Sequence, residues 1–164
     1  MKRFILLFAL FTGGLLCQTT FAQVTHRGNI SSQPIWGPVG YDHVDYYYLP
    51  DMDMYYYVPR HKFIYMEKGH WVSRSGLPPS YKNYDMYNAR KVVINEPKPY
   101  LHHQDYTTKF EYSNGPSNQH LIRDSHEYRY FVNKDHPEHS NWKNSKRDQG
   151  HQQELEHENG RRSN

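Results

Sequence analysis

Histidine is the residue type that most directly suggests chemistry in this sequence. The chain contains 12 histidines, and imidazole nitrogens bind zinc, nickel and copper well. A specific metal site, however, needs three or four ligands held in a fixed geometry. Most of these histidines lie in segments with loop-like composition. A proline lies between His136 and His139, which argues against a helical arrangement of that pair. We therefore expect no specific metal site and no cofactor; the weak candidate ligands are His102, His103, His136 and His139.

Acidic and nucleophilic residues form no recognisable catalytic motif. Four aspartates lie near the tyrosine-rich part of the chain, but the calcium-binding loop pattern with a central glycine and a distal glutamate is absent. The sequence also lacks a Gly-x-Ser-x-Gly nucleophile motif, a His-Glu-x-x-His zinc motif and a glycine-rich phosphate loop. We therefore expect a protein that is not an enzyme.

Tyrosine is concentrated in one part of the chain. Fourteen of the 16 tyrosines lie between Tyr41 and Tyr112, and residues 42–50 and 51–59 are two similar nonapeptides, each with aspartate, a tyrosine triplet, an aliphatic residue and proline. Aromatic rings bury a large area at low entropy cost, so they stack well on the rings of a ligand. The candidate ligand-binding residues are Tyr46, Tyr47, Tyr48, Tyr55, Tyr56, Tyr57 and Trp71.

Short β-strands are the elements that would position these rings, because tyrosine and β-branched residues favour strands. The nonapeptides predict two strands, and three more are expected at 62–66, 70–73 and 90–95, separated by proline and glycine turns. We therefore expect an all-β fold, a small antiparallel meander of four or five strands. Side chains alternate along a strand, so each tyrosine triplet points to both faces. Either both faces of the sheet are covered, or one face presents an aromatic surface to solvent, as an interaction site would; a chain this short has little left to cover a second face.

The N-terminus has the three parts of a secretory signal peptide. Lys2 and Arg3 precede an apolar run of 13 residues, and Thr20-Phe21-Ala22 places small residues where a signal peptidase cuts. A membrane-spanning helix needs about 20 apolar residues, so we expect cleavage after this tripeptide and no transmembrane anchor afterwards. The protein should then be exported to the periplasm, the outer-membrane surface or the medium.

Charge and cysteine content exclude two further classes. Loss of the signal peptide removes Lys2 and Arg3 and leaves 18 basic residues against 17 acidic ones, a balance without the positive footprint of a nucleic-acid-binding protein. It also removes Cys17, the only cysteine, so the exported chain depends on its apolar core instead of disulfides. Nucleic acid is therefore not an expected partner.

Composition divides the chain into five parts. Residues 1–22 are the expected signal peptide, and residues 23–40, with several glycines and prolines, are expected to be a linker. Residues 41–101 are the expected aromatic-rich β domain, followed by a poorly defined extension at 102–132. Residues 133–164 contain only two large apolar residues, which predicts a disordered polar tail because such a segment buries too little surface to offset its chain entropy.

The motifs of the β segment are similar to those of a known group of proteins. They are YYYLPD at 46–51, GHW at 69–71, LP at 77–78 and KVVINEP at 91–97. In these motifs the chain resembles small exported proteins of Bacteroidota-type bacteria, and the resemblance covers residues 41–101. It implies an exported location and a β fold. Because that group has no assigned activity, the resemblance transfers no site residues.

Together these observations favour an exported, non-catalytic envelope protein. We expect a binding or structural module whose aromatic sheet face contacts envelope polysaccharide or protein. The alternative is a periplasmic histidine-rich protein that binds and buffers metal ions. The two hypotheses need different side chains, so the positions of the tyrosine triplets and of the histidines in the fold discriminate between them.

Overall fold

The computed structural model describes residues 28–110 and 117–162. The expected signal peptide and the first five residues of the expected linker lie outside these ranges, as do residues 111–116 of the expected extension and the last two residues of the tail. Within the described ranges, no helix is both long enough and apolar enough to span a bilayer.

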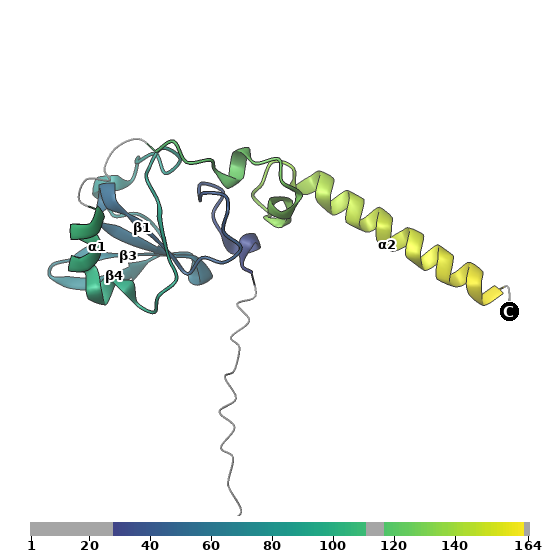
Figure 1. Cartoon of the computed structure of the whole chain (residues 1–164), viewed down its shortest axis with the longest axis horizontal. Helices are drawn as coiled ribbons and strands as arrows, with labels where there is room; N and C mark the ends of the chain where they lie inside the picture. Colours follow the sequence, from purple (N-terminus) through teal and green to yellow (C-terminus); the bar gives the residue numbers. More distant parts are fainter. Residues whose placement is uncertain (1–27, 111–116, 163–164) are drawn as a thin grey trace, which may run out of the picture.

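Five antiparallel strands form a sheet in the order β4-β3-β2-β1-β5. The sheet lies at the left in Figure 1, where β1, β3 and β4 are labelled. They are β1 (Tyr46–Leu49), β2 (Met54–Tyr57), β3 (Lys62–Glu67), β4 (His70–Arg74) and β5 (Val92–Ile94). The expected all-β antiparallel sheet is confirmed, and its first four strands pair in chain order as a meander. The fifth strand crosses to the far edge and pairs with β1. The end of β5 therefore lies beside the start of β1.

The two nonapeptides fold alike, each as a strand followed by a 3-10 turn. Turn η2 (Pro50–Met52) joins β1 to β2, and turn η3 (Val58–Arg60) joins β2 to β3. Each turn ends at a left-handed residue, Asp53 with a φ of 50° and His61 with a φ of 51°. Proline fixes φ near −65°, which suits the first residues of a helical turn but not of a two-residue hairpin. The two nonapeptides therefore form the same kind of wide turn after each strand.

Both faces of the sheet are covered in the described part of the chain. Five of the six triplet tyrosines are buried, and only Tyr57 is half-buried. They divide between two core clusters, one with Tyr47 and Tyr56 and the other with Tyr46, Tyr48 and Tyr55. Of the two arrangements that the triplets allow, the structure therefore has the one with both faces covered, because segments that flank the β domain pack onto the sheet.

Residues 28–40 form the cover of one face and are not the expected linker. The Asn29 side chain accepts a hydrogen bond from the Val44 N–H at 2.9 Å and donates one to the Val44 carbonyl at 2.7 Å. Gln33 is buried, and its amide oxygen accepts a hydrogen bond from the Tyr47 hydroxyl at 3.2 Å. The polar side chains of this segment thus satisfy buried groups of the sheet, which would otherwise carry a desolvation penalty.

Helix α1 (His103–Phe110) packs on the opposite face, where the sequence predicted only a poorly defined extension. The rings of Tyr106 and Phe110 each lie 6.2 Å from that of Tyr48, measured between centroids. Further along the same extension, three apolar side chains are buried: Leu121, Ile122 and Tyr130. The sequence prediction missed these covers because each supplies only a few rings to a core that the strands dominate.

The first residues of the expected tail pack against the rest of the fold. Asn133 and His136 are almost fully buried, and the Asn133 amide donates a hydrogen bond to the Gln33 carbonyl. The chain then forms helix α2 (His139–Arg162), which projects away from the sheet (Figure 1). Glutamate, glutamine, lysine and arginine are good helix formers even without an apolar face. Low apolar content therefore indicated solvation here but did not exclude a helix.

Gly37 provides a test of the first cover. A Cβ at this position would lie 2.6 Å from the Tyr47 hydroxyl oxygen and 3.0 Å from the Pro34 carbonyl oxygen. We expect Gly37→Ala to lower the free energy of unfolding by about 1–3 kcal/mol, as overpacking does in a tight core. Gly76→Ala is the matched control, because a Cβ there meets no atom within 4 Å. Equal denaturant midpoints for the two variants would show that residues 28–40 do not pack on Tyr47.

Lys91 is a buried cation just before β5. Its side chain is 2% exposed, and its ammonium donates a hydrogen bond to the Tyr87 carbonyl at 3.0 Å. Burial lowers the pKa of Lys91 to about 8, although the carboxylates of Asp85 and Asp51 act in the opposite direction. Between pH 8 and the ordinary lysine range, the unfolded chain therefore binds more protons than the folded one, and stability should rise with pH.

This titration predicts an unusual stability profile. The free energy of unfolding should increase by about 1 kcal/mol per pH unit between pH 8 and 9.5. It should fall above pH 10, because burial raises the pKa of Tyr56 to about 12 and the unfolded tyrosines ionise first. Urea melts at successive pH values measure this profile. Lys91→Met should abolish the rise, whereas Lys82→Met, at an exposed site, should keep it; a rise that survives in Lys91→Met contradicts the assignment.

Candidate functional site

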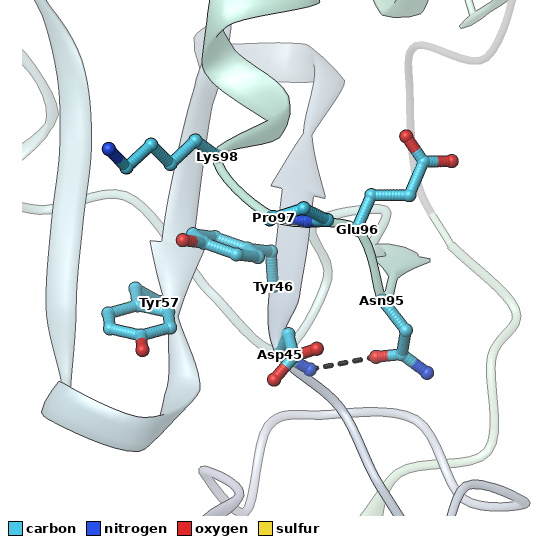
Figure 2. Close-up of a pocket in the computed structure, with 7 residues that line it drawn as sticks. All are labelled: Asp45, Tyr46, Tyr57, Asn95, Glu96, Pro97 and Lys98. Atoms are coloured by element: carbon cyan, nitrogen blue, oxygen red, sulfur yellow. Dashed lines mark hydrogen bonds between the residues drawn. The ribbon is translucent and has the colours of Figure 1, made fainter. Parts of the chain in front are cut away.

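A pocket of about 600 Å³ opens where β1 begins and where β2 and β5 end (Figure 2). The residues that line it come from these strand ends and from the loop after β5: Asp45, Tyr46, Tyr57, Asn95, Glu96, Pro97 and Lys98. The antiparallel order of β2, β1 and β5 brings these three strand ends together. The pocket therefore follows directly from the crossover of β5 to the edge beside β1.

Two stacked tyrosines form the aromatic wall of the pocket. Tyr46 and Tyr57 are directly opposed across β1 and β2, and their rings stack with centroids 4.7 Å apart and planes inclined by 24°. Tyr46 is buried, and burial raises the pKa of its hydroxyl. Tyr57 is only half-buried. Tyr46 thus backs the stack from the core side, and Tyr57 carries the ring surface that a ligand can reach.

Asn95 holds the rim of the pocket in place. Its side-chain oxygen accepts a hydrogen bond from the Asp45 N–H at 2.8 Å, drawn in Figure 2. Its amide nitrogen donates to the His43 carbonyl at 3.3 Å. Pro97 cannot continue the strand because it lacks an N–H, and Lys98 follows in the left-handed conformation with a φ of 51°. The chain therefore turns sharply after β5, and residues 95–98 line the pocket beside the stacked rings.

The charged side chains of the pocket differ in how they are held. The Asp45 carboxylate lies 3.1 Å from the His43 ring, and the Glu96 carboxylate accepts a hydrogen bond from the Tyr106 hydroxyl at 2.8 Å. Each contact involves one carboxylate oxygen and leaves the other oxygen to accept further hydrogen bonds. The Lys98 ammonium has no hydrogen-bond or ion-pair partner among the residues that the structure describes. The pocket therefore offers both acceptors and a donor beside an aromatic surface.

Only two of the seven candidate ligand-binding residues reach this pocket, namely Tyr46 and Tyr57. The hydroxyls of the other triplet tyrosines bond inside the protein: Tyr47 to Gln33, Tyr48 to Asp53, Tyr55 to His103 and Tyr56 to His61. The seventh candidate, Trp71, is half-buried and packs edge-on against His103 with ring centroids 4.9 Å apart. These five side chains stabilise the fold.

The candidate metal-binding histidines do not come together. His103 bridges the Tyr55 hydroxyl and the Asp53 carboxylate, at 3.1 Å from each. His136 and His139 bond to backbone carbonyls, while His102 is exposed. Across residues 28–110 and 117–162, no three histidine, cysteine or acidic side chains are grouped as metal ligands. In the described fold the best-placed histidines thus act as hydrogen-bonding partners.

Sequence reasoning missed the polar half of the pocket. Asp45 looks like one of several turn aspartates, and Asn95, Glu96 and Lys98 look like strand-ending loop residues. A signal was present in the Asn-Glu-Pro-Lys-Pro run, where two prolines hold a charged loop in a fixed conformation. The sequence did not indicate that this loop lies beside the first tyrosine triplet, because that depends on which edge β5 joins.

Comparison with known proteins adds no further evidence on the site: no family model, no curated protein and no solved structure matches the chain.

The two ring environments predict different responses to truncation. Tyr55 is fully buried and bonded to His103, so Tyr55→Ala should lower the free energy of unfolding by about 3–5 kcal/mol, as other large-to-small core changes do. Tyr57 is half-buried at the pocket, and Tyr57→Ala should cost only about 1 kcal/mol. Chemical denaturation of both variants measures the difference. Equal losses would mean that Tyr57 belongs to the core and that the pocket wall is structural.

Proposed function

We propose that the protein is an exported, non-catalytic envelope module that binds polysaccharide through the pocket at Tyr46 and Tyr57. The observation that carries the proposal is the stacked tyrosine pair, with one reachable ring, bordered by carboxylate oxygens and a free ammonium. A pyranose presents C–H groups on one face, which pack on an aromatic ring, and hydroxyls around its edge. The pocket offers partners for both parts of such a ring.

The size and chemistry of the pocket favour a sugar over a protein partner. A protein surface usually needs a large contact area with an apolar core, whereas this site is a single hollow of about 600 Å³, within the range of small-molecule pockets. Hydroxyls can donate to Asp45 and Glu96 and accept from Lys98, so a neutral sugar satisfies all three side chains. Repetition of the same ring along a polymer lets a weak single site retain the chain.

The same lining supports binding without catalysis. Among the described residues that line the pocket there is no serine, cysteine or histidine that would form a nucleophile and base pair. The two carboxylates are each tied to a neighbouring side chain, in contact with His43 and Tyr106 respectively. They are thus positioned as hydrogen-bond acceptors for a ligand. Export rests on the expected signal peptide, and the near balance of charge supports the exclusion of nucleic acid.

Tyr57→Ala tests this function. The chain from Gln23 onward would be mixed with purified insoluble envelope polysaccharide, and with soluble polysaccharides in affinity gels, and the bound fraction measured. Loss of the reachable Tyr57 ring should weaken binding to the polysaccharide by at least about tenfold, because stacking of one ring on an aromatic side chain contributes about 1–3 kcal/mol. Lys98→Ala should weaken it less.

The matched control is Tyr128→Ala, which removes an exposed tyrosine outside the pocket and should leave retention unchanged. Thermal melts of each variant establish that the fold survives. Retention of the Tyr57→Ala protein at the level of the wild type would contradict polysaccharide binding at this pocket. Retention only by envelope protein fractions would favour a protein partner instead.

A further inference from the structure

A second hollow lies on the opposite face of the same β1–β2 hairpin. It has a volume of about 350 Å³. Its walls come from residues 31–36 of the first cover, from Tyr56 on β2, from the η3 turn at His61 and from residues 133–135. Tyr56 and Tyr57 are consecutive in one strand and therefore point to opposite faces. One strand thus contributes a tyrosine to each of two separate pockets.

An indole supplies the aromatic surface of this second hollow. Trp36 is half-buried and meets Tyr56 edge-on, with ring centroids 5.0 Å apart, and its centroid lies 5.5 Å from that of Tyr47. These contacts fix the orientation of the indole. Beneath the indole, the buried side-chain amide of Asn133 donates a hydrogen bond to the backbone carbonyl of Gln33 and fixes this part of the wall. A ligand would therefore meet a preformed aromatic wall.

The polar groups of the second hollow are again a mixture of donors and acceptors. The Tyr56 hydroxyl is bonded to the Nδ1 atom of His61 at 3.1 Å, which leaves the Nε2 atom of the same ring to face solvent or a ligand. Asp135 is exposed, and its charge helps to raise the pKa of Tyr56, after burial as the larger cause. Among the described residues, neither the Asp135 carboxylate nor the Lys134 ammonium has a hydrogen-bond or ion-pair partner.

We propose that this hollow is a second saccharide-binding site, and that the module therefore binds two sugar chains at once. The inference rests on the proposed function of the first pocket, and it extends that function from attachment to cross-linking. The chemistry is similar in kind: an aromatic wall, a carboxylate oxygen that can accept a hydrogen bond and an unpaired ammonium surround a hollow that admits one ring. Because the two hollows open on opposite faces of one hairpin, a single short oligosaccharide cannot fill both.

Bivalent binding has a measurable consequence. A protein with two sites links separate polymer chains, and the linked assembly holds more tightly than either site alone. The linkage needs no second copy of the protein. It depends only on the rigidity of the sheet between the sites, which the covers on both faces supply.

Calorimetry with hexasaccharides of cellulose, chitin, xylan and mannan tests the stoichiometry. For the sugar that binds, we expect two ligands per chain in the wild type. Tyr57→Ala and Asp135→Ala should each bind one, and the double variant none. Addition of the parent polysaccharide should cause turbidity with the wild type but not with the Tyr57→Ala, Asp135→Ala or double variants. Asp105→Asn, which changes an exposed carboxylate of α1 outside both hollows, should behave as the wild type.

The outcomes separate the two proposals. One ligand per wild-type chain, lost in Tyr57→Ala and unaffected by Asp135→Ala, overturns the second site and leaves the first intact. One ligand lost only in Asp135→Ala overturns the proposed function of the first pocket. Failure of all four hexasaccharides to bind the folded wild type counts against both sites. His61→Asn, which keeps a residue tolerant of the left-handed conformation, should repeat the loss seen with Asp135→Ala.

Discussion

The fold depends on the two-residue period of the β-strand. Three consecutive tyrosines in a strand cannot share a face, so the paired triplets of β1 and β2 place large rings on both sides of one small sheet. Each face then needs its own cover, because rings of this size left in water would forfeit the stabilisation that their burial provides. The segments before and after the strands supply those covers, and the boundaries of the folded unit are set by that need.

Hydrogen-bond partners for the tyrosine hydroxyls offset the cost of burying rings on both faces of the sheet. Each fully covered tyrosine brings a hydroxyl into the interior, and a buried hydroxyl without a partner costs about 1–3 kcal/mol. Gln33, Asp53, His61 and His103 provide these partners from turns and covers. Of the histidines that suggested metal chemistry, His103 is thus explained as a hydroxyl partner, whereas His136 and His139 bond to backbone carbonyls. Tyr57, the one triplet ring that stays half-exposed, is also one of the two triplet tyrosines that line the larger pocket.

Sequence patterns predicted the β-strands better than the way in which the strands and the flanking segments pack together. β-strand propensity and turn residues located the strands, because both signals are local: the tyrosine triplets, the prolines after them and the glycine at position 69. The covers at 28–40 and 103–110 were missed because short polar segments with one or two rings look like linkers until a face to cover is known. The polar half of the pocket was missed for a related reason. Its residues lie beside Tyr46 only because β5 pairs with β1, a long-range contact that local sequence patterns do not indicate.

The hydrogen bond from Asn133 to Gln33 also constrains the order of events in folding. It joins residues 100 positions apart, so the sheet cannot be closed on this face until most of the chain has been synthesised. Non-local closure of this kind slows folding, because loop entropy must be lost before the contacts form. A chain that folds slowly leaves more time for translocation before it becomes compact. The late closure is therefore compatible with the proposed export, in which compaction follows passage across the membrane.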